Sequence, residues 1–318
     1  MLVKIENILN NVKKVAISGH VRPDGDCVGS CLGLYNYICD NFKDTECVVF
    51  LENSGNGLSY IKGFDNIKNS FDEEEIDTFD LFISLDTSDI NRVGILSDVY
   101  KKKTNTVCID HHISNTGFAG TNYIEPHMSS CAEVIFNMFD NDKISKETAE
   151  AIYTGIIHDT GVFKYEATSE ATMIAAGKLI SKGIDKTKII DEGFYSKSYR
   201  QNQILGRALL ESILVLDGKC IFSTISKTNM DFYGVEPYEL GGIVEQLRLT
   251  EGVECAIFIY ETKHLEYKVS LRSKNYVDVN EVAAYFGGGG HIRAAGCVMQ
   301  GTAYDVINNI IRQVEKQI

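Results

Sequence analysis

The sequence predicts an α/β fold in two parts, a parallel-sheet N-terminal domain and a smaller α+β C-terminal domain. The chain has 318 residues, of which 44% are hydrophobic, so it can fill two ordinary cores. In its first half, short apolar runs alternate with stretches long enough for helices, which is typical of a parallel sheet. From Ile213 onward, strand-like and helix-like segments are mixed, as in an α+β domain.

The first domain is assigned to residues 1–186. Helical periodicity is found over 145–157 and over 169–182, and Gly183 is placed to cap the second of these helices. The predicted strands of this domain are the apolar runs 14–19, 46–51, 79–85 and 105–109.

Residues 187–212 are predicted to form a connecting helix, because they contain no stretch rich in glycine, proline or serine. The second domain then covers 213–318. Its predicted strands are 212–217, 219–225, 254–260 and 265–273, and its helices lie near 238–248, 279–286 and 303–318.

The composition limits the classes of function. There are 31 lysines and arginines against 44 acidic residues, a formal charge of −13, which opposes the broad cationic surface that long polyanions require. No apolar run approaches the roughly 18 residues that span a bilayer, and the N-terminal segment has the pattern of an amphipathic helix. We therefore expect a soluble cytoplasmic protein that binds short nucleic acids at most and no membrane.

The nine cysteines are scattered without a CxxC pair, which argues against a disulfide framework and against a thiolate zinc site. We expect them to be reduced core residues. Cys27 and Cys31 lie four apart and are expected to pack on one helix face. The acidic run 72–77 is predicted to be a solvated loop.

Two polar motifs follow predicted strands of the first domain. His20, Asp24 and Asp26 stand in the segment HVRPDGD, where two aspartates one residue apart can direct their carboxylates at two neighbouring metal ions. The same D-G-D also suits an ordinary turn or a calcium loop. Asp86 ends a buried strand, where a carboxylate needs a cation or a partner, although an aspartate there can also cap the next helix.

Two further motifs complete the pattern. Asp110, His111 and His112 follow another predicted strand, and Asp159 adjoins an apolar segment. Ligands of open parallel sheets bind beyond the carboxyl ends of the strands, so one shared site is expected. Carboxylates and imidazoles without thiolates suit two divalent ions, Mn²⁺ first, with cobalt, iron or zinc as other occupants.

These four motifs, in this order, resemble the signature of the DHH phosphoesterase family. The C-terminal segment GGGGH at 287–291, followed by Ala294-Ala295-Gly296, resembles the phosphate-binding loop of the DHH-associated domain, as does SLRS around Arg272. Within the family the chain is similar to bacterial nanoRNases (oligoribonucleases) that are also pAp phosphatases. His158 and Cys131 depart from the pattern, where a small hydroxyl residue and threonine are expected.

The resemblance implies a role for each metal-site residue. His20 and Asp24 would hold one ion, and Asp86 would bridge the two. The second ion would be held by Asp26, His111 and Asp159. Among the catalytic residues, Asp110 would orient His111, and His112 would face the substrate.

The resemblance also implies substrate-binding residues and an active site in the cleft between the two domains. Backbone N–H groups of Gly287 to Gly290, including Gly288 and Gly289, would approach a phosphate, with positive charge from His291, Arg272 and Arg293. Arg92 would contact a phosphate or form an exposed salt bridge. A glycine run by itself would equally suit a flexible loop.

Three functions remain open on these residues. The first is hydrolysis of oligoribonucleotides of about two to five nucleotides, together with removal of the 3′-phosphate of pAp. The second is a cyclic di-AMP or pApA phosphodiesterase, and the third, of a different class, is a nucleotide-binding regulatory module without catalysis. A homodimer is compatible with the sequence, which does not fix the oligomeric state.

Overall fold

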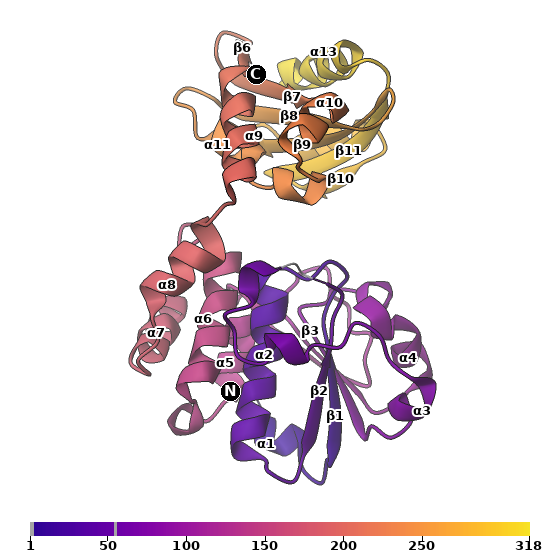
Figure 1. Cartoon of the computed structure of the whole chain (residues 1–318), viewed down its shortest axis with the longest axis vertical. Coiled ribbons are helices and arrows are strands. Elements are labelled where there is room, and N and C mark those ends of the chain that lie inside the picture. Colours follow the sequence, from indigo (N-terminus) through magenta and orange to yellow (C-terminus); the bar gives the residue numbers. More distant parts are fainter. Residues whose placement is uncertain (1–2, 54–55) are drawn as a thin grey trace. The chain divides into compact units, whose positions relative to one another are not determined.

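The structure of the chain is a computed structural model that describes residues 3–53 and 56–318. The chain divides into two compact units, Met1–Ser196 and Lys197–Ile318 (Figure 1). We call them unit 1 and unit 2 and describe each by itself.

Unit 1 contains a five-stranded sheet with the order β2-β1-β3-β4-β5, in which every neighbouring pair is parallel. The parallel α/β fold predicted for this domain is therefore confirmed. The strands are β1 (Lys14–Ser18), β2 (Glu46–Phe50), β3 (Leu81–Leu85), β4 (Thr106–Asp110) and β5 (Thr121–Ile124).

Helices cover both faces of this sheet (Figure 1). Alternate strand residues face opposite sides. Val15 and Ile17 contribute to one core with α2, α5 and α6, whereas Ala16 contributes to a smaller core with α4. The α-helices of unit 1 are α1 (Ile5–Ile8), α2 (Gly25–Asn41), α3 (Glu73–Ile76), α4 (Ser97–Lys102), α5 (Cys131–Met138), α6 (Lys146–Asp159), α7 (Glu170–Ile180) and α8 (Lys186–Ile190).

The segment predicted as one connecting helix is not continuous. A π-helical turn, Asp191–Tyr195, follows α8, and α9 (Tyr199–Leu210) starts anew after Ser198. The Ser198 side chain accepts from the N–H of Gln201, and the Gln201 side chain accepts from the N–H of Ser198. This capping box fixes a new helix start, and the two units divide after Ser196 rather than after residue 186.

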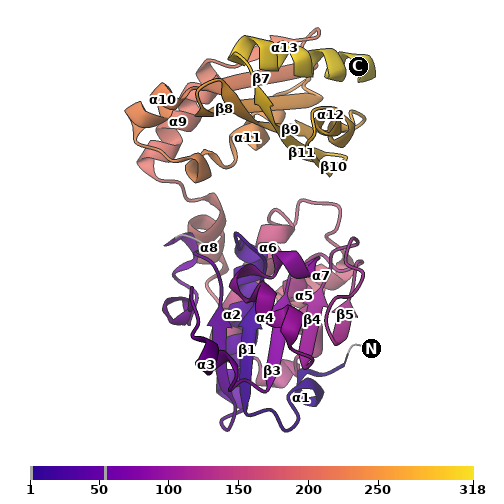
Figure 2. The same ribbon diagram turned by 90° about the vertical axis from the view of Figure 1, so that its right-hand side faces the viewer.

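Unit 2 contains a six-stranded mixed sheet with the order β10-β11-β9-β8-β7-β6, in which only β7 and β8 pair in parallel among the described strands. This confirms the α+β prediction. One face packs on α12 and α13 and the other on α9, α10 and α11 (Figure 2). The elements are β6 (Ile213–Val215), β7 (Cys220–Ile225), α10 (Lys227–Tyr233), α11 (Ile243–Arg248), β8 (Cys255–Lys263), β9 (Glu266–Ser273), α12 (Val279–Tyr285), β10 (Gly289–His291), β11 (Ala294–Gln300) and α13 (Ala303–Val314).

Two smaller expectations need correction. The acidic run forms the short helix α3, which Asp72 caps by accepting from the N–H of Glu74, rather than a loop. All nine cysteines are free, but Cys39 is exposed and Cys47 is half-buried, so not all of them are core residues. Within the described residues, no helix is long and apolar enough to cross a membrane.

Candidate metal centre

The four motifs predicted to form one site do converge in unit 1. His20 follows β1, Asp86 follows β3, and β4 ends at Asp110, so these residues lie at the carboxyl edge of the parallel sheet. Asp26 comes from the first turn of α2, and Asp159 is the last residue of α6. The sheet and the two helices therefore bring together side chains that are up to 139 residues apart in the sequence.

Asp86 lies at the middle of this cluster and is 3% exposed. Its Oδ2 is 3.4 Å from Nε2 of His20, and its Oδ1 is 3.6 Å from Nε2 of His111. Oδ1 is buried and has no hydrogen-bond partner among the described residues. The backbone at Asp86 has φ 54°, a left-handed conformation that costs energy for a residue with a side chain. One carboxylate thus faces two separate groups of ligands.

His20 and Asp24 lie on the Oδ2 side of Asp86. The Nδ1 atom of His20 is 2.8 Å from the carbonyl oxygen of Val21, which turns Nε2 toward Asp86 and toward Oδ1 of Asp24 at 3.7 Å. Asp24 is also the N-cap of α2, where its Oδ1 accepts from the N–H groups of Asp26 and Cys27. The oxygen of Asp24 that caps α2 is therefore also the one that faces His20, and Oδ2 takes no part in the cap.

His111, Asp26 and Asp159 lie on the Oδ1 side of Asp86. Nε2 of His111 is 3.3 Å from Oδ2 of Asp159 and 3.9 Å from Oδ2 of Asp26. Asp26 accepts from the N–H groups of Cys131 at 2.7 Å and Ala132 at 3.0 Å, the first residues of α5. A helix N-terminus stabilises a carboxylate. Cys131, which departs from the family pattern, offers its backbone N–H here, and its thiol donates to a carbonyl oxygen.

The pKa values reflect carboxylates crowded together out of water. Burial opposes protonation of His20, but the adjacent carboxylates of Asp24 and Asp86 outweigh it and raise its pKa to about 12. Burial likewise opposes protonation of His111, yet Asp86 and the other carboxylates raise its pKa to about 10. Burial raises the pKa of Asp159 to about 6 despite the neighbouring imidazole. The negative potential of these carboxylates, which favours protonation of the histidines, also favours binding of a divalent cation.

The residues fit a divalent metal. Among the described residues, Asp86 Oδ1 is a buried acceptor that lacks a donor. Three groups of three possible ligands meet here: His20 with Cys27 and Asp86, Asp86 with His111 and His112, and Asp26 with His111 and Asp159. Oxygen and imidazole donors are the set that Mn²⁺ and similar ions take. The Cys27 thiol lies close to His20 and Asp86, but burial raises its pKa far above the ordinary value, so it is a poor thiolate donor.

The prediction that Asp110 orients His111 is wrong. Asp110 Oδ1 is 2.8 Å from Nδ1 of His112, whereas Nδ1 of His111 lies 3.3 Å from the carbonyl oxygen of Met128. The hydrogen bond to Asp110 raises the pKa of His112 despite partial burial. Asn115, which the sequence did not single out, donates to Oδ2 of Asp110 at 2.7 Å and fixes this carboxylate. Asp110 therefore orients His112, not His111.

The backbone N–H groups of unit 2 that were predicted to bind a phosphate are mostly hydrogen-bonded within the unit. The N–H groups of Gly287, Gly288 and Gly290 donate within the unit, to Ala284, Ala283 and Asn280 respectively. A Cβ at Gly288 would lie 2.3 Å from the carbonyl oxygen of Gly296. The glycines of this segment therefore permit close approach of β10 to β11, and most of their N–H groups are already used.

The cationic side chains near this segment are only partly available. Arg272 pairs with Glu245, and Arg293 donates to the carbonyl oxygens of Val277 and Asn275. His291 and Gly289 are exposed at the edge strand β10. Of the side chains proposed as contacts in unit 2, His291 is exposed and has no hydrogen-bond or ion-pair partner among the described residues.

Comparisons with known proteins identify the domains of the chain. The model of the DHH family, N-terminal domain, matches residues 14–156, and the DHHA1 domain matches residues 217–318. The chain therefore carries the N-terminal domain of the DHH family and a DHHA1 domain, and it is an enzyme that hydrolyses phosphoesters.

The chain is also similar to individual proteins of known name. The chain is 28% identical to the probable bifunctional oligoribonuclease and PAP phosphatase NrnA of Streptococcus mutans, with 93% of each protein covered. It is 28% identical to the cyclic-di-AMP phosphodiesterase PdeA of Listeria monocytogenes, over 99% of this chain and 48% of that protein. The crystal structure of an exopolyphosphatase-related protein from Bacteroides fragilis has a TM-score of 0.90 at 28% identity, covering 98% of this chain and 94% of that one.

Proposed function

We propose that this phosphoesterase uses two metal ions, most favourably Mn²⁺, to hydrolyse oligoribonucleotides of about two to five nucleotides and to remove the 3′-phosphate of pAp. The observation that carries the proposal is the position of Asp86, whose two oxygens face His20 on one side and His111 on the other. The names of the S. mutans relative and of similar proteins support the substrate class.

In this proposal His20 and Asp24 hold one ion, and Asp26, His111 and Asp159 hold the other, with Asp86 shared. Two bound divalent ions supply a water of lowered pKa and positive charge beside the reacting phosphate. The chain's own contribution is to hold the ligands in place, as the N-terminus of α5 does for Asp26.

His112 is proposed as the catalytic residue that contacts the reacting phosphate. Asp110 occupies its Nδ1, so Nε2 is the ring nitrogen that can donate a proton to a phosphate oxygen or to the leaving group. The His112 side chain is 37% exposed, in contrast to the buried Asp110, so a substrate can reach it. Asp110 is a positioning residue.

The test is a substrate panel with the full-length protein, freed of metal and supplied with Mn²⁺ or Mg²⁺. The panel contains pAp, pApA, cyclic di-AMP, RNA of two to five nucleotides and pyrophosphate. We expect turnover of pAp and short RNA, faster with Mn²⁺ because the site mixes imidazole with carboxylate. Absence of turnover for every substrate, with metal bound, would overturn the proposal, as would full activity in Mg²⁺ after rigorous removal of manganese.

A second candidate is a cyclic di-AMP or pApA phosphodiesterase. The similarity to PdeA, which runs over almost this entire chain, favours it. Both candidates use the same metal-site residues, so the panel separates them by the ratio of kcat/KM for cyclic di-AMP to that for short RNA. A regulatory module without catalysis would instead bind nucleotide in Mn²⁺ and leave it intact.

A further inference from the structure

The arginines of unit 1 are confined to one place. Residues 1–196 contain sixteen lysines but only two arginines, Arg22 and Arg92. Both line the same pocket of about 570 Å³, together with Val21, Glu52 and the metal-site residues His20 and Asp24. A volume of roughly 300–1,000 Å³ is usual for small-ligand sites.

The backbone at both arginines is fixed. The N–H of Val21 donates to the carbonyl oxygen of Arg92 at 2.8 Å, which ties the loop after β3 to the loop after β1. The N–H of Arg22 donates to Oε2 of Glu52 at 2.8 Å. Arg22 has φ 55°, a left-handed conformation in which a residue with a side chain is strained. Strain of this kind is retained at functional sites when the surroundings enforce it.

The two guanidinium groups are exposed, and among the described residues neither has an ion-pair partner. Of the two carboxylates that line the pocket, Asp24 caps α2 and Glu52 accepts from the Arg22 backbone N–H. Arginine differs from lysine in presenting a planar fork of donors that matches the oxygens of a phosphate. The chain has a net charge of −13, yet both arginines of unit 1 lie beside the proposed metal ligands.

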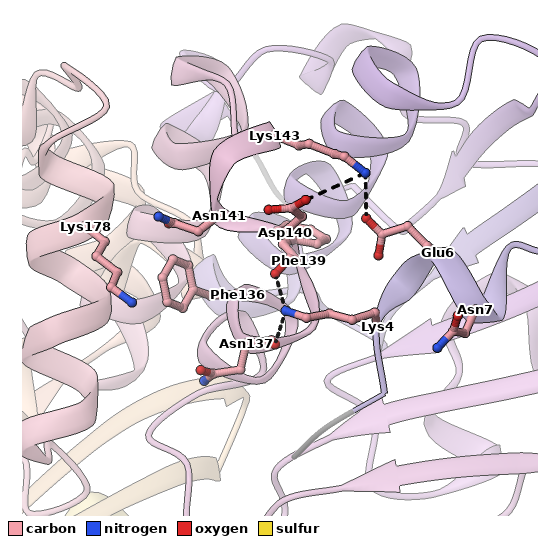
Figure 3. A pocket seen from close by; sticks show the side chains of 10 residues that line it. All are labelled: Lys4, Glu6, Asn7, Phe136, Asn137, Phe139, Asp140, Asn141, Lys143 and Lys178. Carbon is pink, nitrogen blue, oxygen red and sulfur yellow. Dashed lines mark hydrogen bonds and ion pairs between the residues drawn. The ribbon is translucent and has the colours of Figure 1, made fainter.

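A different pocket of unit 1, which is lined by lysines, differs from the arginine pocket in how its positive charges are paired (Figure 3). There Lys4 donates to the carbonyl oxygens of Asn137 and Phe139, and Lys143 lies beside Glu6 and Asp140. The charges in that pocket are largely satisfied within the protein. The guanidinium groups of Arg22 and Arg92, by contrast, have no hydrogen bond or ion pair with the described residues, although the carboxylates of Asp24 and Glu52 line the same pocket.

We propose that Arg22 and Arg92 bind a second phosphate group of the substrate, adjacent to the phosphate that is hydrolysed. This inference rests on the proposed function and narrows its substrate class. The preferred substrates carry two phosphate groups separated by one nucleoside, as pAp and 5′-phosphorylated dinucleotides do. Substrates with the scissile phosphate alone lack this contact.

The test compares pAp with 3′-AMP, which differs only by the missing 5′-phosphate. The variants are Arg22→Gly, which keeps the left-handed backbone accessible, Arg92→Ala, and the charge-conserving Arg22→Lys and Arg92→Lys. Lys102→Ala is the control, since it removes one exposed positive charge of unit 1 away from the pocket. Metal content and thermal stability are measured for every variant.

For the wild type we expect kcat/KM to be about 30-fold or more higher for pAp than for 3′-AMP. A hydrogen bond to a charged group usually contributes a free energy that corresponds to a factor of this size. Arg22→Gly and Arg92→Ala should each reduce this ratio roughly tenfold or more, mainly through KM for pAp, and the lysine variants should restore it only in part. Lys102→Ala should keep the wild-type ratio.

The inference is overturned if the ratio is unchanged in Arg22→Gly and Arg92→Ala, or if both substrates lose equally. Calorimetric binding of pAp and 3′-AMP to the Mn²⁺-loaded protein gives a reading that does not depend on turnover. A wild type that binds pAp more tightly but hydrolyses neither compound would refute the proposed function and leave the arginine contact standing. Equal affinity for the two compounds would refute the contact.

Discussion

At the scale of single residues, Asp86 combines two unfavourable features. Its backbone is left-handed, and its Oδ1 is buried with no donor in the part of the chain that the structure describes. Burying a carboxylate is costly unless a cation or hydrogen bonds compensate. A bound divalent ion on either side would offset both costs, which is why this aspartate is the proposed bridge.

Replacing Asp86 should therefore affect both metal positions. We expect Asp86→Asn to lose most of both ions and to lower kcat by about 1,000-fold or more, because the shared ligand is weakened on each side. His20→Ala should retain roughly one ion per chain, since only one group of ligands is damaged. Metal analysis of dialysed variants gives the result, and equal occupancy in the two variants would contradict the bridging role.

The pair of Asp110 and His112 leads to a separate prediction. Asp110→Asn should lower kcat by roughly 10- to 100-fold while metal content stays at two ions, because the carboxylate orients His112 and not His111. Combining it with His112→Ala should add little further loss, as expected for residues that act as a unit. Loss of metal from Asp110→Asn would restore the original assignment to His111.

The partner of Asp110 was foreseeable from its position. Asp110 ends β4, and in extended backbone residues i and i+2 point to the same side, which pairs Asp110 with His112. The grouping of His20, Asp86 and His111 was predicted from the strand ends alone. Asn115 gave no such signal, because it lies in a loop whose path only the fold determines.

At the scale of elements, α2 and α6 approach closely through glycines. A Cβ at Gly155 would lie 2.5 Å from the Cβ of Ala132 and 2.7 Å from Oδ1 of Asp26. These contacts place α6, α5 and the proposed metal ligand Asp26 against one another. The close packing of these helices therefore also fixes the position of Asp26 in the proposed site.

Gly155→Ala should thus destabilise the protein by about 2 kcal/mol through overpacking and should weaken metal binding by displacing Asp26. Gly177→Ala is the matched control, because Gly177 is an exposed helical residue of α7 with nothing within 4 Å of its Cβ position. It should stabilise the protein by roughly 0.5–1 kcal/mol. Urea unfolding and Mn²⁺ titration of both variants give the comparison; similar effects of the two substitutions would contradict it.

The elements that the sequence predicted are those with an apolar run. Strands β1, β3 and β4 are almost wholly buried and were found on that signal. Strand β5 is at the sheet edge with no fully buried residue, so it has no apolar run to detect. Strand β10 was missed because its glycines are typical of loops, and pairing with β11 makes it a strand.

At the scale of the whole molecule, each unit has its own hydrophobic cores, and all the proposed metal ligands belong to unit 1. A ligand that binds only the folded state stabilises the part of the protein whose folding creates its site. Metal should therefore act on the stability of one unit and not of the other.

We expect calorimetric unfolding of the metal-free protein to show two transitions, one for each unit. Mn²⁺ at a thousandfold excess over its dissociation constant adds about 4 kcal/mol for each ion, so the transition of unit 1 should rise by roughly 10 °C or more. The transition of unit 2 should stay in place, and a chelator should reverse the shift. Asp86→Asn is the control, in which Mn²⁺ should move neither transition appreciably. A single cooperative transition, or an equal shift of both transitions in the wild type, would show that the stability of unit 2 is coupled to the metal site.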